Sequence, residues 1–111
     1  MKQKSETDVF MAIADPTRRR ILSILTGGAV TINALAGNFD ISRPAVSKHI
    51  KVLEQANLIN INESGRERYC QLNQQGFDEI QDWLNFYETF WKSKLSILGE
   101  VLDKRSKNKT V

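Results

Sequence analysis

Residues able to catalyse a reaction or to bind a metal are scarce in this chain. It has a single cysteine, Cys70, and a single histidine, His49. One cysteine excludes an internal disulfide and an all-cysteine zinc site, and one histidine excludes a metal site built on several histidines. No nucleophile–base pair and no glycine-rich phosphate loop is visible. We therefore expect neither an enzyme nor a bound cofactor or metal. We interpret Cys70 as a packed residue of a strand, because it lacks a resolving partner.

Hydrogen-bond donors suited to DNA cluster instead in one short segment. The segment contains Ser42, Arg43, Ser47, Lys48, His49 and Lys51. Arg and Lys donate to guanine, Ser reaches several base edges, and His serves a base or a phosphate. On a helix, such a set predicts a reader of the major groove of double-stranded DNA. The alternative is a solvated helix face in a module that binds protein.

A second basic group follows the turn signal Ser64-Gly65. Arg66 and Arg68 stand two residues apart on an expected strand, so they would share one face beside the DNA backbone or the minor groove. The alternative is an exposed hairpin in which these arginines pair with Glu63 and Glu67.

The distribution of charge agrees with a polyanionic partner. The 111 residues carry 16 Lys and Arg and 13 Asp and Glu, a net charge of +3. Residues 16–70 hold eight basic and four acidic groups, whereas residues 77–103 hold two basic and six acidic groups. The basic segment would face DNA, and the acidic segment would keep the far side off it. Arg18-Arg19-Arg20 spreads over about 200° of a helix, so these three cannot form one patch.

The elements that must hold these groups follow from caps and periodicity. Helices are expected at 6–14, 16–26, 31–36 and from 42 to about 55, with Asp15, Thr31 and Ser42 as N-caps. Strands are expected at 59–62 and 66–72, followed by a long helix over 74–103. Residues 104–111 are expected to be a basic disordered tail. No apolar stretch is long enough to span a membrane and no secretory signal is visible, so we expect a cytoplasmic protein without membrane insertion.

This order of elements predicts a single winged helix-turn-helix domain over residues 1–103. The fold class is mainly α with a β-hairpin wing, in the order ααααββα, and we expect it to be dimeric. Ala36 is the small residue where the two helices of the motif approach each other. Asp40 stands at the turn position where many such motifs have Gly, and an aspartate tolerates left-handed geometry better than most residues.

Three segments resemble the arsenical-resistance-repressor (ArsR/SmtB) family of bacterial transcription factors. They are Ala14-Asp-Pro-Thr-Arg-Arg-Arg-Ile-Leu22, Ile41-Ser-Arg-Pro-Ala-Val-Ser-Lys-His-Ile50, and the wing run Gly65-Arg-Glu-Arg-Tyr69. The stretch Trp83-Leu-Asn-Phe-Tyr-Glu-Thr-Phe-Trp91 is similar to the branch that contains the sporulation-delay autorepressor. The resemblance implies a homodimeric DNA-binding repressor that often controls its own operon. It maps family DNA contacts onto Ser42, Arg43, Ser47, Lys48, His49 and Arg66.

The chain departs from the metal-sensing members of that family. Their sensing helix carries a Cys-x-Cys type motif, whereas the matching stretch here, Thr31 to Asn38, contains no ligand. The last helix of the zinc sensors carries Asp and His ligands, and this one has no His. Asp78, Glu79 and Asp82 are candidates for a hard metal only, and we interpret them as a solvated acidic face. We therefore do not expect metal release to be the inducing event.

The expected last helix carries more apolar surface than one core needs. With about 100° per residue, one stripe contains Phe77, Ile80, Leu84, Tyr87, Trp91, Leu95, Leu98 and Leu102. A second stripe contains Trp83, Phe86, Phe90, Ile97 and Val101. Together they cover about half of the helix, where a stripe of about 100° suffices for a single core. We expect a homodimer formed by the terminal helices, with Phe90, Trp91, Leu95 and Leu98 central. The alternative is that the first helix covers the second stripe within one chain.

These observations lead to one expected function and one alternative. The expected function is a sequence-specific transcriptional repressor that binds an inverted-repeat operator as a homodimer. The DNA-binding residues would be Thr31, Ser42, Arg43, Ser47, Lys48, His49, Lys51, Arg66 and Arg68. A signalling protein that relieves repression is an expected further partner. The alternative is a winged-helix module that binds protein and not DNA.

Overall fold

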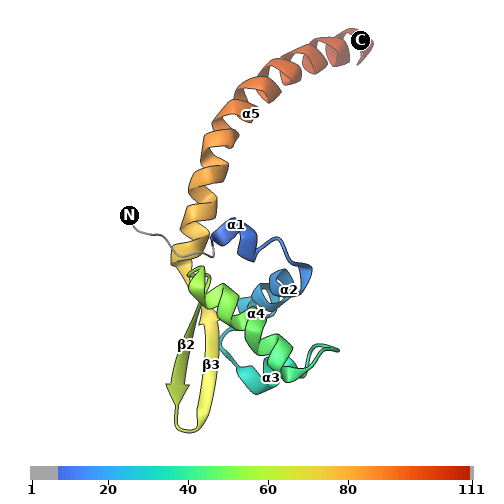
Figure 1. The fold of residues 1–111 in the computed structure, drawn as a ribbon. Helices are drawn as coiled ribbons and strands as arrows, with labels where there is room; N and C mark the ends of the chain where they lie inside the picture. The colour runs from blue at the N-terminus through green and yellow to red at the C-terminus, as the bar shows by residue number, and fades with distance from the viewer. Residues whose placement is uncertain (1–7, 111) are drawn as a thin grey trace, which may run out of the picture. The chain divides into compact units, whose positions relative to one another are not determined.

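The computed structural model describes residues 8–110, with side chains described through Ser96. Its elements alternate between short helices and short strands until one long helix closes the chain (Figure 1). They divide into two units, with the boundary between Ile80 and Gln81. In chain order the elements are α1 (Val9–Ala12), α2 (Pro16–Ile24), the 3-10 turn η1 (Leu25–Gly27), β1 (Val30–Thr31), α3 (Ile32–Ala36), α4 (Arg43–Gln55), β2 (Ile59–Ser64), β3 (Glu67–Leu72) and α5 (Gln74–Thr110).

Side-chain caps start the helices of the winged unit. The Asp15 carboxylate accepts from the Arg18 amide at 3.0 Å, the Thr31 hydroxyl from the Ala34 amide at 3.0 Å, and the Ser42 hydroxyl from the Ala45 amide at 3.2 Å. Each satisfies an amide that has no partner within its helix. The three caps predicted from the sequence are thus confirmed, and they fix where the reader helix α4 begins.

The sheet contains one strand that the sequence did not predict. β3 lies between β1 and β2, and both neighbours run antiparallel to it. β1 has only two residues, with Val30 opposite Cys70 and Thr31 opposite Tyr69. In the wing, Ser64 pairs with Glu67, so Gly65 and Arg66 form a two-residue turn. Gly65 has φ +62°, a left-handed conformation that glycine adopts without strain.

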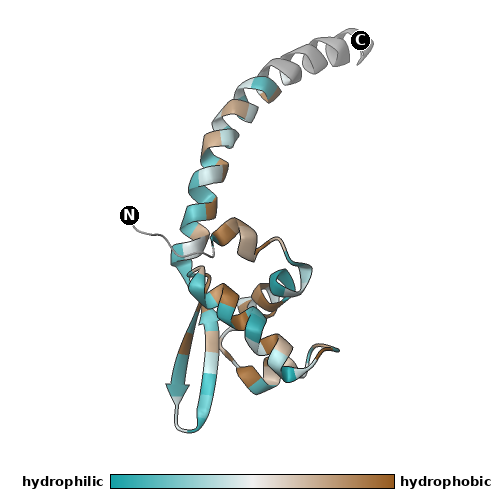
Figure 2. Ribbon diagram, viewed as in Figure 1, coloured by the Kyte–Doolittle hydropathy of each residue, from teal (hydrophilic) through white to brown (hydrophobic). Residues whose placement is uncertain are grey.

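The core lies where α1, α2, α3, α4 and the base of the hairpin meet. Ile59 is buried and Asn60 exposed, which is the alternation expected of a half-buried strand. In Figure 2 strand β2 accordingly changes from hydrophobic at its start to hydrophilic toward the turn. The large buried side chains are Val9, Ile21, Leu22, Leu25, Ile32, Leu35, Val46, Ile50, Leu53, Leu58, Ile59 and Cys70.

Several element bounds differ from those expected. The first helix has only four residues, and α2 gives way to a 3-10 turn at Leu25. β3 begins at Glu67, so Arg66 lies in the turn and not on the strand face with Arg68. Helix α5 continues through Thr110, where a disordered tail was expected after 103. Lys and Arg are good helix formers and no proline interrupts residues 104–110, which explains the longer helix.

A close backbone contact joins the start of α5 to the end of α4. The Gly76 amide donates to the Asn57 carbonyl at 2.8 Å, and Asn57 has φ +62°. A Cβ added at Gly76 would lie 2.6 Å from that carbonyl oxygen, so only glycine fits. Phe77 and Ile80 then pack against the core, which anchors the first turns of α5 to the winged unit. No described helix, α5 included, is both long and apolar enough to cross a membrane.

Candidate nucleic-acid interface

Helix α4 has one apolar side that is buried in the core and an opposite side that carries polar and basic residues. Val46, Ile50 and Leu53 are buried in the core. Positions 43, 47 and 51 recur every four residues, so Arg43, Ser47 and Lys51 share one side. Lys48 is exposed, whereas Ser47 and His49 are half-buried. The predicted reader helix is thus present, but two of its predicted contact residues are less exposed than expected.

Two adjoining cavities lie between α4 and the wing. One, of about 190 Å³, is lined by Ser47, Lys51, Glu54 and Arg68 together with Ile32, Ile50 and Ile61. The other, of about 80 Å³, is lined by Ile32, Asn33, Arg43, Arg66, Glu67 and Arg68. Arg68 borders both, so it marks the seam between helix and hairpin. The fold therefore brings together basic groups that the sequence separates by some 20 residues.

The exposed basic side chains of α4 and the wing have no partner of opposite charge among the residues that the structure describes. Within the described residues, none of Arg43, Lys48, Lys51, Arg66 and Arg68 makes an ion pair or a hydrogen bond. Glu63 is directly opposite Arg68 in the register of β2 and β3, yet the two do not form an ion pair. Among the described residues there is thus no ion pair of the kind expected in the alternative, in which the wing arginines pair with Glu63 and Glu67. Five exposed cations remain available to phosphates.

His49 and Thr31 have partners inside the protein. The Arg18 guanidinium approaches the His49 ring, with 3.1 Å between Nη1 and Nδ1. The Thr31 hydroxyl caps α3 and is half-buried. The remaining predicted contacts lie at the cap of α4, on α4 or on the wing, and within the described part of the chain only the Ser42 cap has a hydrogen-bond partner: Ser42, Arg43, Ser47, Lys48, Lys51, Arg66 and Arg68.

The triple arginine is occupied in structural contacts. Arg18 donates from Nε to the Ala12 carbonyl at 2.7 Å, and Arg19 donates to the Ile13 carbonyl at 2.8 Å. The Arg20 guanidinium lies 5.1 Å from the centre of the Phe39 ring. The first two contacts satisfy carbonyls at the end of α1, and the third is a cation–π contact. Neither the contact of Arg18 with His49 nor the place of Asn33 in the lining of the smaller cavity was predicted from the sequence.

Neither redox nor metal chemistry is supported by the described residues. Cys70 is buried, and this burial raises the pKa of its thiol to about 11. A protonated thiol is a poor nucleophile, in agreement with the interpretation of Cys70 as a packed residue. Among the described residues no three His, Cys, Asp or Glu side chains gather to hold a metal ion.

Comparison with known proteins identifies the family. Residues 13–62 match a family of helix-turn-helix domains. The transcriptional repressor SdpR of Bacillus subtilis is 42% identical over 80 residues, which cover 71% of this chain and 89% of that protein. The HTH-type transcriptional regulator Rv2034 of Mycobacterium tuberculosis is 34% identical over 90% of this chain and 91% of its own length.

A solved structure supports the same assignment. The crystal structure of an ArsR family transcriptional regulator has a TM-score of 0.70 and 37% identity, and the match covers 76% of this chain and 92% of that chain. The winged fold, the unpaired cations on α4 and the wing, and these relatives agree. This chain belongs to the ArsR family of winged helix-turn-helix proteins, and it is a DNA-binding transcriptional repressor and not an enzyme.

Proposed function

We propose that this repressor works in the cytoplasm as a homodimer that binds an inverted repeat, in the control region of its own operon. The observation that carries the proposal is the set of five unpaired cations on α4 and the wing. The N-terminal half of α4, from Ser42 to Lys51, enters the major groove, and the turn at Arg66 lies against the backbone. A bound dimer then blocks the polymerase.

The residues divide into two roles. Arg43 and Lys48 are exposed on the first two turns of α4, where they reach base edges, with Ser47 beside them. Arg66 at the tip of the turn and Arg68 at the seam contact phosphates. Lys51 lies one turn beyond Ser47 and faces the same groove edge. Thr31, at the start of α3, has its hydroxyl hydrogen left to donate to a phosphate.

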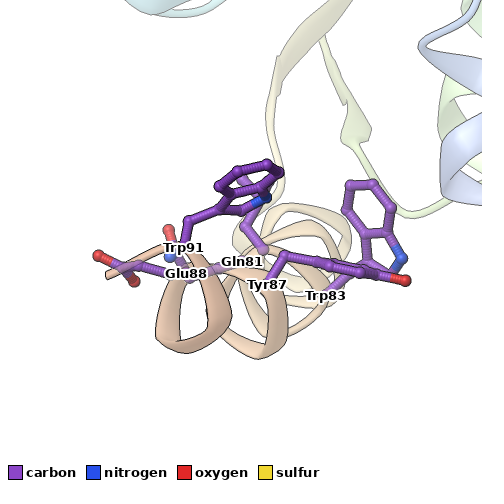
Figure 3. Close-up of a pocket in the computed structure, with 6 residues that line it drawn as sticks. Gln81, Trp83, Tyr87, Glu88 and Trp91 are labelled. Atoms are coloured by element: carbon purple, nitrogen blue, oxygen red, sulfur yellow. The ribbon is translucent and has the colours of Figure 1, made fainter. Parts of the chain in front are cut away.

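The homodimer is supported by the second unit. Between residues 81 and 96 the apolar side chains of α5 are exposed in both stripes, with 71% of Phe86 and 58% of Leu95 open to solvent. A groove of about 550 Å³ along this helix is lined by Gln81, Trp83, Leu84, Tyr87, Glu88 and Trp91 (Figure 3). Tyr and Trp are the residue types that dominate binding energy at protein interfaces.

We infer that a second copy of the same helix fills this groove, because a two-fold contact buries the exposed apolar surface of both copies at once. Phe90, Trp91 and Leu95 are about half exposed in the single chain and would be central to the contact. The side chain of Leu98, also expected there, lies outside the described residues. The alternative, in which the first helix covers the second stripe within one chain, stays a prediction.

We also propose that no metal induces this repressor. The segment that matches the family's sensing helix, Thr31 to Asn38, offers neither Cys nor His. Relief of repression then depends on a partner protein that changes the dimer or removes it from DNA. A titration of the bound complex with zinc, arsenite and a chelator should leave DNA affinity unchanged, and release by any of them would overturn this part.

The test of the proposal is binding to a duplex taken from upstream of the chain's own coding sequence, with a scrambled duplex as control. Arg43→Ala and Lys48→Ala should each cost about 1–3 kcal/mol on the specific duplex and much less on the scrambled one. Arg66→Ala should weaken binding to both and flatten the salt dependence. Absence of specific binding by the unaltered protein at moderate salt would overturn the proposal and favour a protein-binding module.

A further inference from the structure

The side chain of Arg18 connects three elements through all of its guanidinium nitrogens. Nε donates to the Ala12 carbonyl at 2.7 Å, and Nη2 donates to the Met11 carbonyl at 3.2 Å, so the end of α1 holds one side. Nη1 lies 3.1 Å from Nδ1 of His49 on the reader helix α4. These three contacts fix the guanidinium, which belongs to α2, in a single orientation against the imidazole ring.

This contact determines which ring nitrogen carries the hydrogen. A guanidinium has five N–H donors, no acceptor, and a permanent charge. It can bond to Nδ1 only when that nitrogen offers its lone pair. The hydrogen of a neutral His49 then resides on Nε2, which has no partner within the described residues. Without the guanidinium, a neutral imidazole distributes its hydrogen between the two nitrogens.

We propose that Arg18 is a positioning residue that holds His49 as the neutral Nε2–H tautomer and thereby presents one hydrogen-bond donor to a DNA phosphate oxygen. A phosphate oxygen is a hydrogen-bond acceptor, so His49 binds it only through an N–H donor at Nε2. The other tautomer would present a lone pair at Nε2 and repel it. The inference rests on the proposed binding of DNA by α4.

Two charged groups face the ring from the neighbouring element α2 and its cap. They are the Arg18 guanidinium, whose Nη1 lies 3.1 Å from Nδ1, and the Asp15 carboxylate, which interacts with the ring through electrostatics. The direct hydrogen bond to Nδ1 is compatible only with the unprotonated nitrogen. Arg19 extends from the same helix to the Ile13 carbonyl and, within the described residues, makes no hydrogen bond to His49, so it provides a matched control.

The tautomer can be measured in the free protein, because His49 is the only histidine of the chain. With ¹⁵N-labelled histidine above neutral pH, we expect an unprotonated signal for Nδ1 and a protonated signal for Nε2. Arg18→Ala should move both signals toward their average, and Arg19→Ala should leave them unchanged. A wild-type protein with the hydrogen on Nδ1, or signals unaffected by Arg18→Ala, would overturn the proposal.

The consequence for DNA is tested with a double-mutant cycle on the upstream duplex. Arg18→Ala should weaken specific binding by about threefold to tenfold, the range for one lost hydrogen bond. In a His49→Ala background the same change should have almost no effect, because no ring remains to be positioned. Equal losses in both backgrounds would show a purely structural role and overturn the proposal.

A further variant and a measurement on the free protein cover the cases in which Arg18→Ala does not fold or no specific DNA is bound. If Arg18→Ala does not fold, Arg18→Lys retains the charge but not the planar fork, and its ring signals should lie between those of wild type and the averaged pair. If the unaltered protein binds no specific DNA, the proposed function fails, while the ¹⁵N signals of the free protein still decide whether Arg18 fixes the tautomer.

Discussion

The winged unit and the second half of α5 use apolar residues in opposite ways. In residues 8–80 most of the large apolar side chains converge on one core, and only Phe10, Met11 and Ile41 are exposed among those described. From residue 81 to 96, Trp83, Leu84, Phe86, Tyr87, Phe90, Trp91 and Leu95 are all exposed. The first pattern stabilises a single chain, and the second is useful only to a chain that has a partner. The winged unit is thus the part that carries the candidate DNA interface, and the second half of α5 is the part proposed to join two copies of the chain.

The largest expected effect comes from comparing one leucine of each region. Leu35→Ala opens a cavity in the core and should lower the free energy of unfolding by about 2–5 kcal/mol. Leu95→Ala should leave the winged unit folded but weaken the dimer, so that the unfolding midpoint falls more at low than at high protein concentration. Urea unfolding at several concentrations checks both variants. Equal, concentration-independent losses would remove the distinction between the two regions.

Gly76, which meets the backbone of Asn57 inside the winged unit, should be the next most sensitive position. Gly76→Ala places a methyl group 2.6 Å from the Asn57 carbonyl oxygen, which must shift. We expect a loss of about 1–3 kcal/mol in unfolding free energy, as for other overpacked sites. Gly99→Ala is the control, since a Cβ there meets nothing within 4 Å. A Gly76→Ala variant as stable as wild type would contradict the close approach.

A smaller effect, dependent on pH, is expected at the cap of α2. Partial burial raises the pKa of Asp15, but the Arg18 amide and the neighbouring charges outweigh it and lower the pKa below 3.8. A lowered folded-state pKa means that the carboxylate stabilises the fold above 3.8, and that this stabilisation is lost as the pH falls below that value. Asp15→Ala should cost about 1 kcal/mol near neutral pH.

Asp15→Asn serves as the matched control, because Asn also caps a helix but does not titrate. It should retain most of the neutral-pH stability and lose part of the acid sensitivity. Thermal unfolding of the three proteins between pH 2 and 7 provides the measurement, at roughly the range where carboxyls titrate. Identical acid profiles for wild type and Asp15→Asn would contradict a lowered pKa.

The smallest effect concerns Cys70. Because burial raises the pKa of its thiol to about 11, the folded protein should resist alkylation by iodoacetamide at pH 8, and unfolded protein should react at once. The raised pKa also implies stability that is complete below pH 9.0 and declines toward about 11. Mass spectrometry after timed labelling provides the readout. Rapid modification without unfolding would show that the hairpin base opens.

Local signals in the sequence predicted the parts of the fold that depend on neighbouring residues. Asp15, Thr31 and Ser42 cap helices because their side chains reach an amide three residues away, a relation visible in the sequence itself. The alternation of Ile59, Asn60 and Ile61 likewise predicted a half-buried strand. The winged fold followed from the order of these elements, and the family followed from the resemblance of the segments 14–22, 41–50 and 65–69.

The features that the sequence did not predict depend on residues that lie far apart in the chain. Val30 and Thr31 form a strand only because Cys70 and Tyr69 pair with them, some 40 positions later. Arg18 meets His49 across 31 positions, which no periodicity reveals. A two-residue strand is also too short to show alternation. The sequence likewise predicted two apolar stripes on α5 but not which of them meets a partner, because that choice is made between chains.

The most direct test of the account is a footprint of the purified protein on the duplex from upstream of its own coding sequence. If two reader helices act together through α5, two protected blocks should appear at the same protein concentration, with centres roughly 34–36 Å apart along the helix axis. A Trp91→Asp variant should lose both blocks together. A single protected block, or protection that Trp91→Asp leaves intact, would contradict a dimer built on this helix.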